Sequence, residues 1–299
     1  MENMQTKMQL AIFLRNLICF IGFLPVLAAT VSGMGTTCDS DDALEWNSGD
    51  YNCDSKNSVE RTKKIPNMTR MVKDGTTIII NATQKHSASV ILSHGLGDTA
   101  DGWADAAMEL SKRLPHIRWI LPTAPSNPVA MNGGMRMPSW YNIASLSTSR
   151  SHQQCEGIEE STATLISLVE KEKASGIDYS RIVLAGFSQG GAMSLWAGLQ
   201  FASSHSSRLG GVVCMSGYLP KDHAFVISEH GKNTPVLHCH GSSDPLVLPS
   251  FAEESHQHIL QAGHSAGYDL KMYRGLAHSA NMQELVDIAT WIASIVPPV

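Results

Sequence analysis

A serine between glycines, in Gly186-Phe187-Ser188-Gln189-Gly190, is the residue whose surroundings best fit covalent chemistry. It follows an apolar run at residues 181–185 and precedes a helix-like segment at 191–201. A sharp turn from a strand into a helix lifts such a serine above the sheet, and the small residues leave room for that turn. The alternative is a glycine-rich turn whose serine only caps the helix. The position between an apolar strand and an apolar helix favours a nucleophile.

A serine hydroxyl needs a base to take its proton and an acid to orient that base. When the nucleophile lies on such a turn, the acid precedes the histidine in the chain. Asp244 comes soon after the apolar run at 235–239, and we expect it to be the acid. Asp222 and Asp287 are the competing carboxylates, but Asp222 lies further from its strand and Asp287 lies within the last helix. An Asp before proline also favours turns, which is the structural alternative for Asp244.

Two copies of the tripeptide His-Ser-Ala, beginning at His264 and His278, compete for the role of the base. Residues 268–273 alternate as a strand does. His264 precedes this strand and would lie at the wrong end of the sheet. His278 follows it, where a loop can reach the serine. We therefore expect His278 to be the base.

Acyl transfer also needs two N–H groups that stabilise the oxyanion. Gln189, the residue after the serine, is expected to supply one of them. The loop His94-Gly95-Leu96-Gly97-Asp98 follows an early apolar run, and we expect the N–H of Leu96 to be the second donor. An ordinary glycine turn is the alternative for this loop.

These residues must be positioned by alternating strands and helices. Short apolar runs predict strands at residues 77–80, 88–92, 117–121, 181–185, 211–215, 235–239 and 268–273. Helical spacing predicts helices at 103–114, 158–172, 191–201, 251–262 and 282–295. This order implies an α/β fold with a mostly parallel central sheet and helices on both faces. Active sites of such sheets lie at the carboxyl ends of the strands, where the predicted residues fall.

Composition excludes several other classes of protein. The chain has 299 residues, of which 43% are hydrophobic and 16% charged, so it can bury a large core. A net charge of −5 gives no reason to expect nucleic-acid binding. Six cysteines without a C-x-x-C pair argue against a disulfide scaffold or a zinc site. His238-Cys239-His240 suggests a metal, but no third ligand is evident, so we expect no metal and no cofactor.

The N-terminus differs from the rest of the chain. Residues 1–33 carry Lys7 and Arg15, then an apolar run and small residues, which is the order of a secretory signal peptide; an uncleaved anchor or an unused extension is the alternative. Residues 34–75 are polar and predict a linker. Cys38 and Cys53 lie in it and could pair in an oxidising compartment. Residues 76–299 then form the predicted globular domain.

Further segments extend these motifs: Pro122-Thr123-Ala124-Pro125, Met137-Pro138-Ser139-Trp140-Tyr141, Ser216-Gly217-Tyr218-Leu219-Pro220 and Gly275-Leu276-Ala277-His278-Ser279. In this order the whole set resembles the acyl-protein thioesterase / lysophospholipase family of α/β-hydrolases, from about residue 76 to the end. The resemblance implies a catalytic triad of Ser188, Asp244 and His278, with Leu96 and Gln189 as oxyanion donors. It also implies an acyl-binding region near Met137 and Trp140, for which ordinary loop packing is the alternative.

The resemblance implies a serine hydrolase that cleaves palmitoyl-protein thioesters, with lysophospholipase-type activity. Its partner would be an acylated protein or a lysolipid, with membrane contact through the acyl substrate or the N-terminal segment. Family members are mostly cytoplasmic, whereas a working signal peptide would place this chain in the secretory pathway. A general carboxylesterase and a catalytically silent binding protein are the alternatives. Two departures from the family are Ser93, where leucine is usual, and Asn142, where aspartate is usual and which could alter a loop salt bridge.

Overall fold

A computed structural model describes residues 71–146, 150–201 and 207–299. The predicted signal-like segment, most of the predicted linker and the Cys38–Cys53 pair lie outside the described residues. Strand β1 (Met71–Asp74) falls within the range predicted as linker, so the folded part begins earlier than expected. None of the helices in the described ranges is long and apolar enough to cross a membrane.

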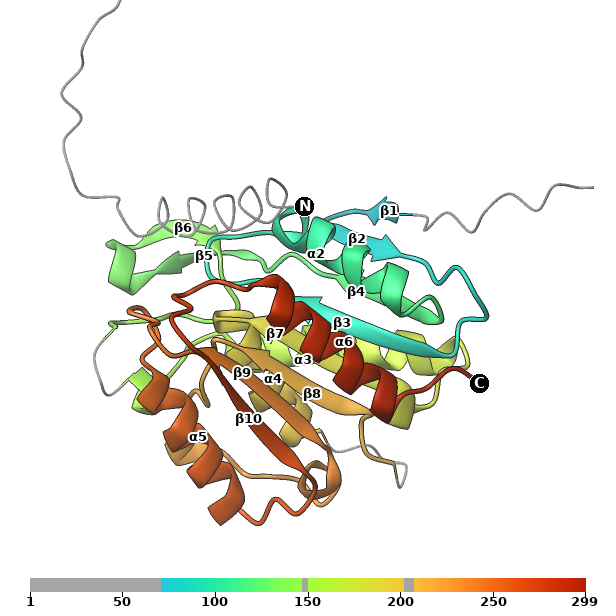
Figure 1. The fold of residues 1–299 in the computed structure, drawn as a ribbon. Helices are drawn as coiled ribbons and strands as arrows, with labels where there is room; N and C mark the ends of the chain where they lie inside the picture. The colour runs from blue at the N-terminus through green and yellow to red at the C-terminus, as the bar shows by residue number, and fades with distance from the viewer. Residues whose placement is uncertain (1–70, 147–149, 202–206) are drawn as a thin grey trace, which may run out of the picture. The chain divides into compact units, whose positions relative to one another are not determined.

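The centre of the domain is an eight-stranded sheet in the order β1-β2-β4-β3-β7-β8-β9-β10 (Figure 1). Its strands after β1 are β2 (Thr77–Ile80), β3 (Ala88–Ser93), β4 (Ile117–Leu121), β7 (Ile182–Phe187), β8 (Gly211–Met215), β9 (Val236–Gly241) and β10 (Tyr268–Tyr273). The pairs β1–β2 and β2–β4 are antiparallel, and every pair from β4 to β10 is parallel. The carboxyl ends of six strands therefore meet at one edge, as the sequence predicts.

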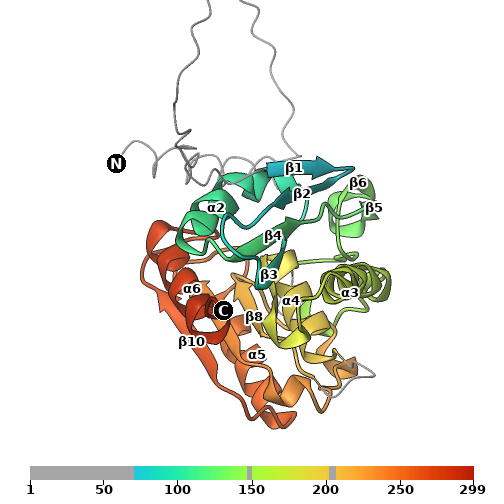
Figure 2. The same ribbon diagram turned by 90° about the vertical axis from the view of Figure 1, so that its right-hand side faces the viewer.

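Helices cover both faces of this sheet, so the predicted α/β architecture is confirmed. Helices α2 (Ala100–Arg113) and α6 (Met282–Ile295) pack together on one face. Helices α3 (Ile158–Ala174) and α4 (Gln189–Leu199) lie on the other, and Figure 2 shows α3 and α6 on opposite sides of the sheet. Helix α5 (Pro249–Gln261) packs on β9 and β10.

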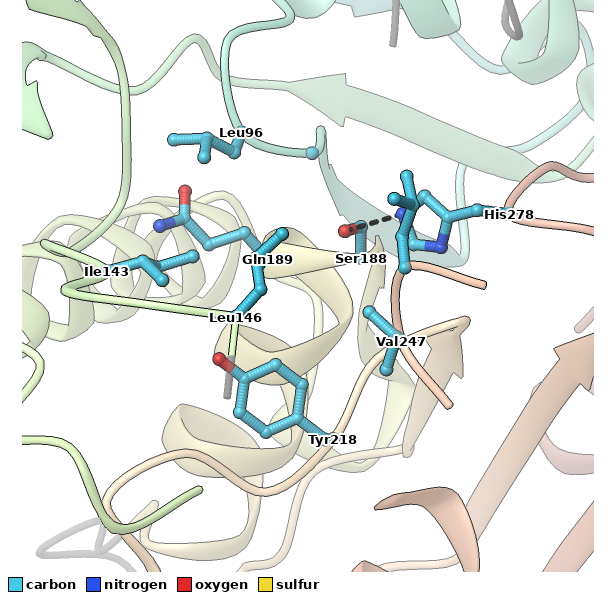
Figure 3. Close-up of a pocket in the computed structure, with 10 residues that line it drawn as sticks. Leu96, Ile143, Leu146, Ser188, Gln189, Tyr218, Val247 and His278 are labelled. Carbon is cyan, nitrogen blue, oxygen red and sulfur yellow. Dashed lines mark hydrogen bonds between the residues drawn. The ribbon is translucent and has the colours of Figure 1, made fainter. Parts of the chain in front are cut away.

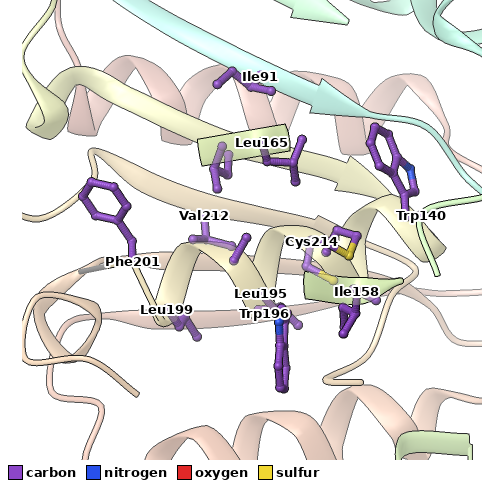
Figure 4. Packing of buried hydrophobic residues seen from close by; sticks show 14 of the residues in the cluster. Ile91, Trp140, Ile158, Leu165, Leu195, Trp196, Leu199, Phe201, Val212 and Cys214 are labelled. Carbon is purple, nitrogen blue, oxygen red and sulfur yellow. The ribbon is translucent and has the colours of Figure 1, made fainter. Parts of the chain in front are cut away.

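Two apolar clusters, one on each face, hold the layers together. Strands β3, β7, β8 and β9 are buried along their whole length, which explains their continuous apolar sequences. Helix α4 is buried at every position, because it lies between α3 and the sheet. Figure 4 shows Trp196 and Leu195 of α4 in the cluster that joins this helix to Val212 of β8. The turn that carries Ser188 is thus anchored in the most buried part of the domain.

A hairpin of β5 (Ser126–Val129) and β6 (Met135–Pro138) was not predicted. A proline in each strand and the pair Gly133-Gly134 between them give a sequence typical of loops. Asn142 ties the following segment to its surroundings, since its side chain accepts from the N–H of Ala130 and donates to Glu156. An aspartate at this position would instead place two carboxylates side by side.

Candidate active site

Ser188 occupies the turn between the end of β7 and the first residue of α4, as predicted. Its backbone is at φ 54° and ψ −117°, a region that residues with a side chain rarely adopt. The Ser188 N–H donates to the carbonyl oxygen of Met215 at 2.8 Å. Buried elements on both sides hold this strained conformation, which directs the hydroxyl to the carboxyl edge of the sheet.

Gly186 and Gly190 make the turn sterically feasible. A Cβ on Gly186 would lie 2.2 Å from the carbonyl oxygen of Gly190. A Cβ on Gly190 would lie 2.2 Å from the carbonyl oxygen of Ser93, at the end of β3. Both contacts are with backbone atoms, which cannot rotate away. The glycines are therefore needed to bring the turn against the loop that follows β3.

The structure brings together the serine, the histidine and the aspartate that the sequence predicts as a triad. Nε2 of His278 is 2.9 Å from Oγ of Ser188, and Figure 3 marks this bond with a dashed line. Nδ1 of the same ring is 2.7 Å from Oδ2 of Asp244. A carboxylate accepts from Nδ1–H, so the neutral imidazole presents an unprotonated Nε2 to the serine. Hydrogen bonds connect the three side chains in a row, and each side chain comes from a different loop.

Asp244 is buried and its carboxylate is held on both oxygens. Oδ1 accepts from the N–H groups of Leu246 and Val247, each at 2.9 Å, while Oδ2 accepts from His278. The ring of His278 lies against Phe187, with the ring centroids 4.9 Å apart. The acid and the base are therefore fixed in orientation before any substrate is bound.

The competing residues lie elsewhere. Nε2 of His264 bonds to the carbonyl oxygen of Thr234, which precedes β9, at the amino end of the sheet. Asp222 pairs with Nδ1 of His152, and Asp287 accepts from the hydroxyl of Tyr273. None of these three competing residues contacts Ser188, whereas His278 does.

Two backbone N–H groups beside Ser188 are available to an oxyanion. Within the described part of the chain, the N–H of Leu96 makes no hydrogen bond. The N–H of Gln189 belongs to the first residue of α4 and has no acceptor within the helix. The positive end of the helix dipole also lies at this point. The sequence predicts these two N–H groups as the oxyanion donors, and that role stays a prediction.

His94 holds the loop that contains Leu96. Its Nε2 accepts from the N–H of Ala124 at 2.9 Å, so its proton is on Nδ1, which donates to the carbonyl oxygen of Gly95 at 2.7 Å. Burial lowers the pKa of His94 from 6.5 to about 4, and the ring is neutral at pH 7. The neutral ring can both accept and donate, which fixes the loop at two points.

Trp140 holds the same loop through a hydrogen bond and does not line the pocket beside Ser188. It is fully buried, and its indole N–H donates to the carbonyl oxygen of His94 at 2.8 Å. The side chain of Gln189 accepts from the backbone N–H of Trp140 and donates to the carbonyl oxygen of Tyr141. The tryptophan thus connects the loop that contains Leu96 to the start of α4.

An apolar pocket opens beside Ser188 (Figure 3). Neither Met137 nor Trp140 lines it: Trp140 is fully buried, and Met137 packs half-buried against the core. A substrate contact at these two residues stays a prediction without support from this pocket. The residues that line the pocket are Gly95, Leu96, Ile143, Leu146, Ser188, Gln189, Tyr218, Leu246, Val247 and His278.

Of the apolar side chains in the pocket wall, the sequence predicts only that of Leu96 as part of the site. Tyr218 follows β8 and Val247 follows β9 closely, so their positions after predicted strands were a usable signal. Ile143 and Leu146 lie in a long irregular segment, where no periodic pattern shows which side chains turn inward. Within the described ranges, no group of three His, Cys, Asp or Glu side chains is arranged to hold a metal ion.

Comparisons with known proteins point to one family. The model of the phospholipase/carboxylesterase family matches residues 74–296. The acyl-protein thioesterase 1 of Yarrowia lipolytica is 40% identical over 219 residues, covering 71% of this chain and 94% of that protein. The acyl-protein thioesterase 1 of Cryptococcus neoformans var. neoformans is 37% identical over 231 residues, with the same coverage.

Solved structures give the same result for the fold. The crystal structure of Zea mays acyl-protein thioesterase 2 aligns with a TM-score of 0.66 and 28% identity, over 75% of this chain and 100% of that chain. Arabidopsis thaliana SOBER1 aligns with a TM-score of 0.64 and 29% identity, over 70% of this chain and 99% of that one. The fold is that of the α/β-hydrolases, and the chain belongs to the phospholipase/carboxylesterase family.

Proposed function

We propose that this protein hydrolyses acyl thioesters and esters, and that its main substrate is a protein carrying a fatty acyl group on a cysteine. The observation that carries the proposal is the hydrogen-bonded line from Asp244 through His278 to Ser188, which ends at an apolar pocket. The similarity to acyl-protein thioesterases at 37–40% identity supports the choice of substrate.

The proposed reaction begins when Oγ of Ser188 attacks the acyl carbon and its proton passes to Nε2 of His278. Asp244 holds the other ring nitrogen and stabilises the imidazolium. The N–H groups of Leu96 and Gln189 bind the oxyanion, and each donor of this kind contributes about 10²–10³ in rate. The carbon–sulfur bond then breaks, and the leaving sulfur takes the proton from His278.

Deacylation repeats these steps with water. His278 takes a proton from a water molecule, whose oxygen bonds to the acyl carbon. The bond from that carbon to Oγ of Ser188 then breaks, and Oγ takes the proton back from His278. The products are a fatty acid and the free serine. A thiol with a pKa of about 8.5 leaves more readily than an alcohol or an amine, so a thioester is the easiest substrate for this site. A lysolipid ester fits the same sequence of steps, with an alcohol as leaving group.

The pocket supports an acyl chain rather than a charged group. Its wall carries Leu96, Ile143, Leu146, Leu246 and Val247, and these side chains remove methylene groups from water. Each buried methylene contributes about 0.8 kcal/mol. The enclosed space is only about 20 Å³, so a longer acyl chain should bind more tightly to the extent that it lies against these apolar side chains.

The test is a series of acyl thioesters and oxyesters from acetyl to palmitoyl, hydrolysed by the full chain beside Ser188→Ala. A kcat/KM that rises with chain length, together with loss of activity in the variant, is the expected result. A maximum at acetyl or butyryl esters would favour a general carboxylesterase. Inactivity of the folded parent protein on the whole series would favour the catalytically silent binding protein and refute the proposal.

A further inference from the structure

A second histidine, His240, lies buried behind Asp244 and takes no part in the proposed reaction. It is the next-to-last residue of β9, and its side chain has no exposed surface. Its Nε2 is 2.8 Å from the carbonyl oxygen of Val247 and 3.6 Å from Oδ2 of Asp244. Because a carbonyl oxygen can only accept, Nε2 carries the proton and donates it to Val247.

The main chain of Val247 connects this histidine to the acid. The N–H of Val247 donates to Oδ1 of Asp244 at 2.9 Å, while its carbonyl oxygen accepts from His240. The two bonds hold the peptide groups on either side of the Val247 Cα, one at the carboxylate and one at the histidine. The orientation of the carboxylate that faces His278 therefore depends on a bond made on the far side of the loop.

Backbone hydrogen bonds hold the first half of this loop, and in the second half the side chain of Val247 packs with Tyr218 and Phe251. The N–H groups of Ser242 and Ser243 donate to the carbonyl oxygens of Tyr273 and Leu276. The side chain of His240 reaches the half that returns past Asp244 toward α5. Val247 also lines the apolar pocket, so one bond supports both the acid and part of the pocket wall.

We propose that His240 is a positioning residue, which holds Asp244 in its working orientation through the carbonyl group of Val247. The inference rests on the proposed function, since it requires Asp244 to be the acid of the triad. Burial also lowers the pKa of His240 below its ordinary value, which keeps the ring neutral, with one N–H for the carbonyl oxygen. The charged and titratable groups nearest to it are Asp244, His278 and His238.

Two substitutions separate the donor from the bulk of the ring. In His240→Gln the amide nitrogen can reach the position of Nε2, whereas in His240→Asn the side chain is too short. We expect the Asn variant to lose about 10–100-fold in kcat, the size typical of a residue that orients a ligating or catalytic group, and the Gln variant to keep most of its activity. A folded Gln variant as inactive as the Asn variant would contradict the role of the donor.

Val247→Ala is the matched control for the pocket wall. It shortens the side chain that faces the pocket and keeps both backbone bonds, so it should raise KM for long acyl chains by a larger factor than it lowers kcat. For His240→Asn we expect the opposite result, a lowered kcat with little change in KM. If the Asn variant changed only KM, His240 would be a pocket residue and the proposal would be wrong.

A double-mutant cycle with Asp244→Asn gives the decisive measurement. If His240 acts through Asp244, adding His240→Asn to Asp244→Asn should cost no more than about threefold further in kcat. If the loss of kcat in the double variant equalled the product of the losses in the two single variants, the inference would be wrong. Full activity of Asp244→Asn alone would instead refute the triad, so the two failures are distinguishable. If His240→Asn does not fold, the folded Gln variant decides, because a large loss of kcat there refutes the proposal.

Discussion

Replacing Gly190 by alanine tests whether the close approach of the serine turn to the oxyanion loop sets the activity. The added Cβ would lie 2.2 Å from the carbonyl oxygen of Ser93 and 2.6 Å from that of His94. Ordinary contact requires the two backbones to separate by about 1 Å. This separation moves the loop that carries the N–H of Leu96 away from Ser188.

The expected effect follows from that displacement. A misplacement of about 1 Å in a catalytic arrangement costs on the order of 10²-fold in rate, so kcat/KM of Gly190→Ala should fall by about that factor. Overpacking costs about 1–3 kcal/mol, and the better helix propensity of alanine offsets up to about 1 kcal/mol of it. The two costs are of similar size, since a 10²-fold loss of rate corresponds to about 2.7 kcal/mol, so urea unfolding must show that the variant is still folded under the assay conditions.

Gly198→Ala is the matched control, because Gly198 lies on the same helix α4. Its Cβ would meet Cγ2 of buried Val212 at 2.4 Å, so the strain falls on a core side chain of β8 and not on the backbone of the loop that carries Leu96. The assay is hydrolysis of a p-nitrophenyl acyl ester, with urea unfolding of each variant. We expect Gly198→Ala to keep its kcat/KM. A Gly190→Ala protein with kcat/KM within about threefold of the parent would refute the reasoning from close approach.

Three further predictions concern buried polar groups. Burial lowers the pKa of His238 from 6.5 to about 3, so the free energy of unfolding should fall as the pH drops below about 6.5; His238→Gln should lose less of it between pH 7 and pH 5, as measured by urea unfolding. Burial raises the pKa of Glu284 from 4.5 to about 8, so the free energy of unfolding should fall as the pH rises from about 4.5 to about 8 and level off above that. Glu284→Gln should therefore be more stable than the parent at pH 9 but not at pH 5. The buried hydroxyl of Ser93 has no hydrogen-bond partner among the described residues, so Ser93→Ala should raise the free energy of unfolding by about 1–2 kcal/mol, and a loss of stability would show that the hydroxyl is satisfied.

The sequence predicts the sheet well because its central strands are buried on both faces. Their apolar runs stand out from the polar turns around them, and the strand order along the chain implies a parallel sheet. The same patterns fail for β1 and for the β5–β6 hairpin, which are short and lie away from the core strands. Their residues belong to strands only because neighbouring segments pair with them.

The site divides in the same way. Ser188, Asp244 and His278 were predictable, since each follows a recognisable strand and the carboxyl ends of parallel strands share one edge. The supporting roles of Trp140 and His240 could not be predicted. Each depends on one hydrogen bond to a backbone carbonyl, that of His94 for Trp140 and that of Val247 for His240. Spacing along a chain carries no information on such contacts.

The sequence by itself thus determined the fold class, the residues that could form the acid–base–nucleophile line and the two expected oxyanion donors, since local patterns report burial and turns. The tertiary structure decided which side chains form the pocket wall and how the loops around Ser188 are held. Those properties depend on packing between segments that are far apart in the chain. Their physical cause is the meeting of several loops at one edge of the sheet, where each loop is fixed by hydrogen bonds to the others.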